Sequence, residues 1–278
     1  MELRLLNRSD VETVMAYKDV AGWNQSLADW ERFIRLNPAG CFATELNGKV
    51  VGVTTTFVYK GGTGCVGILA VDPGYRRQGI GTSLLKSAVA HLEGRGVDTV
   101  HAYTPPISKS VFERLGFSTG SEIERWVLYR KEAAPVLART ALPDLEKILA
   151  ADREVFGADR GELLRSLHAD APDFTLATEL EGEVIGYALG RGGSRADHLG
   201  PWVAWDPPTA RELLSEFLRR SGRDTVIVDC PKANEMAREL LLSQGFLISR
   251  PMIRMVRGGE THPGRPELLC GILGPEFA

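Results

Sequence analysis

The stretch that decides the fold reads VGILAVDPGYRRQGIGTSLL over residues 66–85. Its first six residues form an apolar run typical of a buried strand, and Asp72-Pro73-Gly74 then marks a turn. A loop with two arginines and two glycines follows and leads into an amphipathic helix. This order of strand, glycine-containing loop and helix is typical of an α/β fold.

The loop also has the residue types of a diphosphate-binding site. A helix N-terminus presents unpaired N–H groups and the positive end of the helix dipole, and both attract phosphate. Gly79 and Gly81 allow close approach of the backbone to an anion, while Arg76 and Arg77 add positive charge. A solvated turn is the alternative interpretation of the arginines.

The sequence repeats itself at an offset of 134 residues. FATELNGKVVGV at 42–53 and LATELEGEVIGY at 176–187 share seven of twelve residues. An Asn-Gly or Glu-Gly pair in each copy predicts a tight turn between two strands. We therefore expect two domains of one fold and a short connector. The predicted ranges are 1–130 for the first domain, 136–257 for the second and 258–278 for an irregular C-terminal tail.

Hydrophobic periodicity predicts a mixed α/β sheet in the first copy. The expected strands are 1–6, 41–46, 50–59, 65–71, 99–103 and 125–130. The expected helices are 10–19, 29–36, 82–92 and 109–115.

The second copy lacks the glycine loop. Where the first copy has ten residues from Gly74 to Ser83, the second has five from Pro208 to Glu212, without a glycine. Because prolines donate no N–H, the pair Pro207-Pro208 removes possible anion ligands. We expect the anion site in the first domain alone.

Composition excludes several classes of function. With 33 Lys and Arg against 36 Asp and Glu, the net charge is −3, so nucleic acid and acidic membrane surfaces are not expected partners. Four widely spaced cysteines and five histidines show neither metal-ligand nor disulfide spacing. The charged N-terminal residues do not fit a signal peptide, and no apolar run reaches membrane-spanning length. We expect a cytoplasmic protein without a bound metal.

Residues 76–81, Arg-Arg-Gln-Gly-Ile-Gly, resemble the pyrophosphate-binding motif of the GNAT superfamily of N-acetyltransferases, which is Arg or Gln, two residues, Gly, any residue, then Gly or Ala. The preceding strand and the Leu115-Gly116-Phe117 sequence that ends a later helix match this family in order. The resemblance covers about residues 1–130. It implies two GNAT-like domains, each with a central, mostly antiparallel and splayed sheet flanked by helices.

The resemblance implies that acetyl-CoA is the acyl donor and binds to the first domain. Backbone N–H groups of the loop would bind its pyrophosphate, and the strand before the loop would bind the pantetheine arm where the sheet splays. The residues assigned to the cofactor in this way are Leu69, Ala70, Val71, Arg76, Arg77, Gln78, Gly79, Ile80, Gly81, Thr82 and Phe112.

Acetyl transfer to an amine requires a base for the ammonium, a donor for the oxyanion and stabilisation of the CoA thiolate. The N–H of Leu69 is the expected oxyanion donor. Phe112 occupies the position where the family often has a tyrosine acid, so either another residue supplies the proton or the thiolate leaves without an acid. The candidates are Tyr103, His101 and Glu45, for each of which simple packing or solvation is the alternative.

The acceptor side is expected near Trp23, Asn24 and Trp30, although tryptophan at helical spacing is equally typical of a core. The predicted function is acetyl-CoA-dependent N-acetylation of a primary amine on a small molecule or peptide, by direct attack in a ternary complex. A non-catalytic acyl-CoA-binding regulatory module is the alternative, which Phe112 favours. The chain is expected to be a monomer with an internal pseudo-dimer, or a homodimer.

Overall fold

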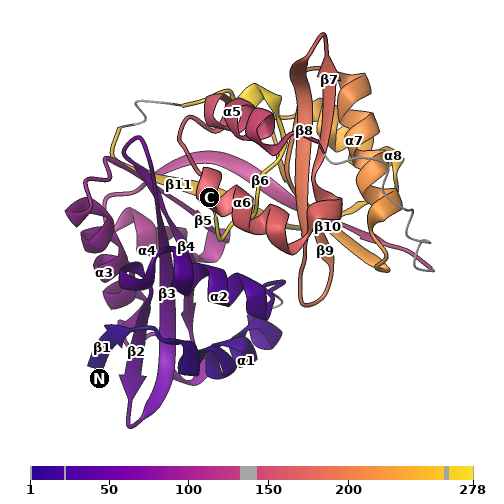
Figure 1. Cartoon of the computed structure of the whole chain (residues 1–278). Coiled ribbons are helices and arrows are strands. Elements are labelled where there is room, and N and C mark those ends of the chain that lie inside the picture. Colours follow the sequence, from indigo (N-terminus) through magenta and orange to yellow (C-terminus); the bar gives the residue numbers. More distant parts are fainter. Residues whose placement is uncertain (1, 22, 132–142, 260–262, 278) are drawn as a thin grey trace. The chain divides into compact units, whose positions relative to one another are not determined.

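A computed structural model describes residues 2–21, 23–131, 143–259 and 263–277, without the side chains of 17–21. The chain divides into two compact units (Figure 1). The first unit comprises Met1–Gly120, Arg254–Thr261 and Pro275–Ala278. The second comprises Ser121–Ile253 and His262–Gly274.

The first unit contains a mixed sheet with the strand order β1-β2-β3-β4-β5, followed by the last residues of β11. The pairs β1–β2, β2–β3 and β3–β4 are antiparallel, whereas β4 and β5 are parallel. The strands are β1 (Glu2–Leu5), β2 (Phe42–Leu46), β3 (Lys49–Tyr59), β4 (Thr63–Val71), β5 (Thr99–Thr104) and β11 (Leu247–Arg257). The helices are α1 (Val11–Ala21), α2 (Leu27–Leu36), α3 (Ile80–Gly94) and α4 (Lys109–Glu113).

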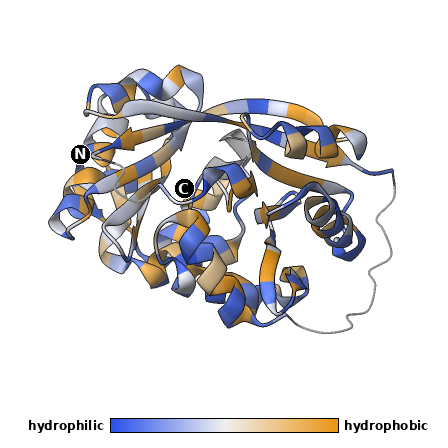
Figure 2. Ribbon diagram, turned by 90° about the horizontal axis from the view of Figure 1, so that it is seen from above, coloured by the Kyte–Doolittle hydropathy of each residue, from blue (hydrophilic) through white to orange (hydrophobic). Residues whose placement is uncertain are grey.

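Helices α2 and α3 cover opposite faces of this sheet. Ile80 and Leu84 of α3 pack against Val51 of β3, while Phe33 of α2 packs against Phe57 of β3 at a ring distance of 5.5 Å. Helix α2 begins at a capping box formed by Ser26 and Asp29. Figure 2 shows both hydrophilic and hydrophobic residues along the helices, as expected for amphipathic helices with one buried side.

Strand β4 contains the irregularity that shapes the centre of the first unit. Two of its residues, Gly67 and Ile68, face the single β3 residue Thr55, which defines a β-bulge. The Ile68 amide donates to Thr55 Oγ1 at 2.9 Å. Pairing of β4 with β5 ends at Val66 and Ala102. The rest of β4 therefore diverges from β5, and this part of the sheet is splayed as predicted.

The second unit also contains a mixed sheet, with the order β11-β6-β10-β9-β8-β7. Strands β9 and β10 are parallel, and β12 pairs with β9. The strands are β6 (Ser118–Tyr129), β7 (Leu176–Leu180), β8 (Glu183–Gly192), β9 (Asp197–Ala204), β10 (Thr225–Pro231) and β12 (Leu269–Gly271). The helices are α5 (Leu145–Phe156), α6 (Gly161–Asp170), α7 (Pro207–Arg220) and α8 (Glu235–Ser243).

The last strand of each sequence repeat is divided between the two units. Residues 121–129 of β6 pair with β10 in the second unit, whereas residues 254–257 of β11 belong to the first. The tail predicted as irregular contains the short strand β12. Most of the predicted connector lies outside the described residues.

Candidate active site

The arginine- and glycine-containing loop forms an open helix N-terminus. Gly79 is the N-cap of α3, with a φ of 82°, and no side chain caps the helix there. The Ser83 amide donates to the Gly79 carbonyl at 2.9 Å, which is the first bond of the helix. The amides before it point out of the helix end, and Arg77, Gln78 and Gly79 are exposed.

The surroundings of this helix end suit a bulky anion. A Cβ built at Gly79 meets no atom within 4 Å, and one at Gly81 is 3.6 Å from Val71. The Arg76 guanidinium donates to the Val71 carbonyl at 3.1 Å, which holds it near the end of β4. Thr82 follows in the first turn of α3, while Ile80 is buried. These residues combine N–H donors, positive charge and open space, as a diphosphate requires.

Strand β4 leads from its bulge to this loop. Leu69 pairs with Thr54 of β3 directly after the bulge, and Ala70 and Val71 continue the strand beyond its pairing with β5. Because β4 and β5 have separated here, backbone groups on that edge of β4 are available to an extended ligand. The structure thus brings the predicted cofactor residues of β4 and of the loop together.

His101 lies on the face of the sheet covered by α2, since it pairs with Cys65, which pairs with Phe57. Its Nδ1 atom is 2.7 Å from an Nη atom of Arg254. Burial and the positive charge of Arg254 lower the pKa of His101 to about 3. The imidazole is therefore neutral near pH 7 and accepts a hydrogen bond from Arg254. Arg254 belongs to the other sequence repeat, so the pattern around His101 did not reveal it.

The remaining candidates for proton transfer occupy different places. Tyr103 follows His101 on the same face of β5, just beyond the paired part of that strand. Glu45 lies on β2, where it accepts from Arg4 at 2.8 Å. Strand β3 and β4 separate Glu45 from β5, a span of about 14 Å at the usual strand spacing. The structure brings Tyr103 and His101 together but not Glu45.

The aromatic residues of the predicted site differ in burial and packing. Phe112 of α4 is buried and packs edge-to-face on Phe117 at 5.4 Å. Trp30 is fully buried and packs on Phe33, so it belongs to the core. Asn24 is buried and Trp23 half-buried in the segment between α1 and α2. Of the three predicted acceptor residues, Trp23 is thus the most accessible.

Residues near the end of the chain also reach the face covered by α2, which the sequence did not predict. Phe277 is fully buried, and its ring lies 5.3 Å from Phe33. Its carbonyl accepts from the Tyr59 hydroxyl at 2.6 Å. A Cβ built at Gly67 would be 2.2 Å from the Glu276 carbonyl, so the bulge glycine allows the segment to approach β4.

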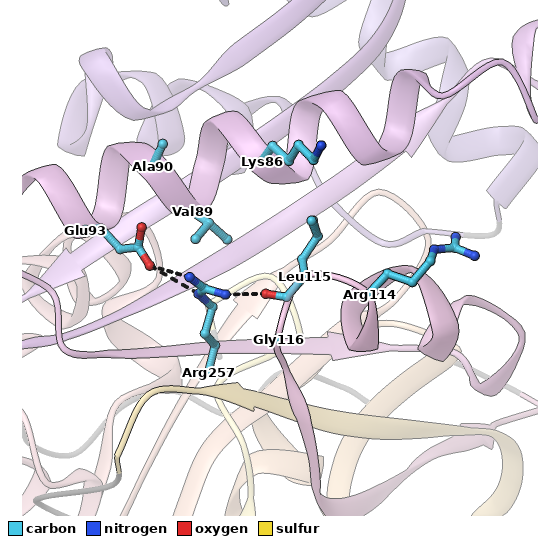
Figure 3. Close-up of a pocket in the computed structure, with 8 residues that line it drawn as sticks. All are labelled: Lys86, Val89, Ala90, Glu93, Arg114, Leu115, Gly116 and Arg257. Carbon is cyan, nitrogen blue, oxygen red and sulfur yellow. Dashed lines mark hydrogen bonds and ion pairs between the residues drawn. The ribbon is translucent and has the colours of Figure 1, made fainter.

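A groove of about 410 Å³ lies between α3 and the end of α4 (Figure 3). Val89 and Leu115 form an apolar part of it. At one end Arg257 forms an ion pair with Glu93 at 2.7 Å. Lys86 and Arg114 extend away from that pair in Figure 3 and form no ion pair with a described residue. The groove offers two positive charges beside an apolar surface.

Two kinds of feature were not found among the described residues. No group of three or more His, Cys, Asp or Glu side chains there is arranged to hold a metal ion. Helices in the described ranges are all too short or too polar to span a membrane.

Family models match both halves of the chain. The model described as acetyltransferase (GNAT) family matches residues 6–117, and the acetyltransferase (GNAT) domain model matches residues 148–271. The chain is a tandem GNAT acetyltransferase. Acetyltransferases of this superfamily use acetyl-CoA. The regulatory-module alternative therefore loses its support, because the family is one of enzymes.

Relatives agree with this assignment over different lengths. An uncharacterized N-acetyltransferase, YitH, of Bacillus subtilis is 22% identical over 88% of this GNAT chain and 87% of its own length. A mycothiol acetyltransferase of Thermobispora bispora is 35% identical, but over 34% of each chain. The present chain thus spans about a third of the length of that relative.

Solved structures share the fold of this GNAT chain. A putative acetyltransferase from Pyrococcus horikoshii superposes with a TM-score of 0.82 at 21% identity, over 100% of this chain and 95% of its own. A GCN5-related N-acetyltransferase from Sphaerobacter thermophilus gives a TM-score of 0.63 at 18% identity, over 92% and 95%.

Proposed function

We propose that the first unit transfers the acetyl group of acetyl-CoA to a primary amine of a small molecule or peptide, in the cytoplasm and by direct attack in a ternary complex. The observation that carries this proposal is the uncapped N-terminus of α3 next to the part of β4 that has separated from β5. The first is suited to a diphosphate and the second to an extended amide-containing chain. Acetyl-CoA contains both.

The residues present fit each part of this donor. Amides from Arg77 to Thr82 would bind the pyrophosphate, with Arg76 and Arg77 adding charge. Leu69, Ala70 and Val71 would pair with the pantetheine arm. Lys86 and Arg114 would bind the 3′-phosphate, with the adenine against the apolar part of the α3–α4 groove. When bound, the donor supplies an activated thioester carbonyl.

The reaction forms a C–N bond and breaks the C–S bond of the thioester. The amine nitrogen attacks the carbonyl carbon, the Leu69 N–H stabilises the oxyanion, and CoA leaves as a thiolate. The ammonium first loses a proton to solvent, since an alkylammonium has no free electron pair, and the attacking nitrogen loses a second proton to solvent as the amide forms. We assign Tyr103, which follows His101 on the same face of β5, as the donor of a proton to the departing thiolate. Neutral His101, with its strongly lowered pKa, is a poor base and instead helps to position this face.

The decisive experiment uses two glycines that flank α3 at its opposite ends. Gly79 and Gly96 both have positive φ, at 82° and 74°, and a Cβ built on either meets nothing within 4 Å. Gly79→Glu places a carboxylate at the N-terminus and is expected to weaken acetyl-CoA binding by at least about a hundredfold, equivalent to about 2.7 kcal/mol. Gly96→Glu has the same backbone strain and should bind normally.

Isothermal titration calorimetry with acetyl-CoA measures this difference, and thermal unfolding checks that both variants fold. Equal affinity of the two variants would contradict the assigned cofactor site. A panel of amino acids, polyamines and aminoglycosides, with detection of free thiol, then tests the acceptor class. We expect CoA release that depends on the added amine.

A further inference from the structure

The second unit contains a gap between two parallel strands, and a segment of the same chain fills it. Strands β9 and β10 are paired from Asp197 and Val226 as far as Leu199 and Val228. Beyond this point β12 lies against β9, antiparallel, with Leu269 opposite Val203. In the first unit no described strand occupies the equivalent gap between β4 and β5.

Residues 269–273 make hydrogen bonds on both sides of this gap. The Ile272 amide donates to the Asp229 carbonyl of β10 at 2.9 Å, while β12 pairs with β9. The Asn234 side chain donates to the Leu269 carbonyl at 3.0 Å. The Arg191 guanidinium donates to the Leu273 carbonyl at 2.7 Å. The segment thus lies as an added strand against β9 and donates one backbone hydrogen bond to β10.

The filling segment is packed as closely as a core element. Cys270 and Leu273 are fully buried. A Cβ built at Gly200, in β9, would be 2.0 Å from the Ile272 carbonyl. Gly200 therefore lacks a side chain where residues 269–273 pass. In the first unit, Gly67 likewise lacks one where Glu276 passes.

A carboxylate of the same chain caps the N-terminus of α7, the helix that follows β9. The Asp206 carboxylate accepts from the Thr209 amide at 2.7 Å and caps α7. Pro207 and Pro208 follow and donate no N–H. At the corresponding position of the first unit, Gly79 caps α3 without a side chain. In the second unit a carboxylate thus occupies the N-terminus of α7, whereas in the first unit the N-terminus of α3 is open.

We propose that the second unit binds part of its own chain in place of acyl-CoA. Residues 269–273 take the place of the pantetheine arm and the Asp206 carboxylate that of the pyrophosphate. The comparison with pantetheine rests on the function proposed for the first unit. The groove of the second unit is accordingly a site for an extended peptide, and the whole chain binds one acetyl-CoA.

Hydrogen exchange on the intact chain, with and without acetyl-CoA, tests this proposal. We expect amides of 269–273 to be protected as strongly as those of β9 in both conditions. Acetyl-CoA should slow exchange in 68–82 and leave 199–214 unchanged, and calorimetry should give one site per chain. Rapid exchange across 269–273, protection of 199–214 by acetyl-CoA, or a second bound equivalent would overturn the proposal.

These outcomes separate the proposal from the function assigned to the first unit. If acetyl-CoA alters exchange in neither region, the proposed function fails, while protection of 269–273 still supports a peptide-filled groove. If acetyl-CoA protects both regions, the first unit's function stands and the filled groove is excluded.

Two glycines of the second unit provide a matched variant and control. Gly200→Ala should displace the segment and accelerate exchange at the Ile272 amide by at least about tenfold. Gly192→Ala, at the end of β8, has its nearest atom 3.8 Å away and should leave that amide unchanged. If Gly200→Ala does not fold, Gly271→Ala is milder, because its Cβ would be 3.1 Å from Val228. Unchanged exchange in a folded Gly200→Ala would contradict the close packing on which the proposal depends.

Discussion

His101 and Arg254 are 153 positions apart in the sequence, yet their side chains are 2.7 Å apart. Burial and this guanidinium lower the pKa of His101 from 6.5 to about 3. The unfolded chain therefore binds a proton below about pH 6.5 that the folded chain does not accept until about pH 3. Below pH 6.5 the free energy of unfolding should fall by about 1.4 kcal/mol per pH unit because of this residue.

His101→Gln removes this titrating group. Between pH 7 and 5, the free energy of unfolding of the variant should therefore fall by about 2 kcal/mol less than that of the wild type. Denaturant unfolding at the two pH values measures the difference, and NMR titration of the imidazole gives its pKa directly. An ordinary pKa for His101, or equal losses in the two proteins, would refute the assigned neutral state.

Lys86 and Arg114 allow a test of how CoA is oriented in the groove. If they bind the 3′-phosphate, the wild type should prefer CoA to dephospho-CoA by about tenfold or more. The double variant Lys86→Gln/Arg114→Gln should lose this preference and keep its affinity for dephospho-CoA. Arg95→Gln, at the exposed end of the same helix, is the control. An unchanged preference in the double variant, measured by calorimetry, would place the 3′-phosphate elsewhere.

At the scale of elements, the bulge in β4 depends on one of two adjacent threonines. Thr54 and Thr55 are both fully buried, but only Thr55 accepts a hydrogen bond, from the Ile68 amide. Thr54 Oγ1 has no hydrogen-bond partner among the described residues. Thr55→Val should thus cost about 1–3 kcal/mol by leaving a buried N–H unsatisfied, whereas Thr54→Val should be neutral or stabilising.

Chemical denaturation of both threonine variants checks this difference. Thr55→Val should also reduce acetyl transfer, because the bulge directly precedes Leu69, whose amide is the proposed oxyanion donor. Equal stability of the two variants would mean that the bulge does not need the hydroxyl.

Most elements of the fold could be predicted from the sequence, because strands such as β3 and helices such as α2 have clear periodicity. The loop at residues 76–81 could be placed between strand and helix for the same reason. Strand β12 is only three residues long, too short for a periodic signal. The contact of Arg254 with His101 was not predictable, because neither residue's neighbours in sequence indicate which strand will pair beside it.

The residues of the acceptor side could not be predicted from the sequence either. Helical spacing could not decide whether Trp30 contacts a substrate or the core, since both uses put tryptophan on one helical stripe. Packing on Phe33 and complete burial place it in the core. Phe277 was missed because its position depends on a partner, Tyr59, that lies 218 residues earlier.

At the scale of the whole molecule, each repeat contributes part of its last strand to the other unit. Residues 254–257 complete the first unit, and residues 121–129 lie in the second. A chain ending at Arg130 should therefore not fold, because β5 lacks its neighbour β11 and leaves an unpaired edge. Circular dichroism and size-exclusion chromatography test this, with co-expression of residues 131–278 as the control that should restore folded protein. A stable, monomeric fragment 1–130 would contradict the expectation.

The divided strands also affect folding during synthesis. A ribosome makes the first unit's loop and helices early, yet residues 254–257 are made only after most of the second unit. Until then β5 is an unpaired edge in a crowded cell, where nascent chains readily associate. Protection of that edge by a chaperone, rather than rapid folding of an N-terminal domain, would then limit how much of this enzyme a cell can accumulate.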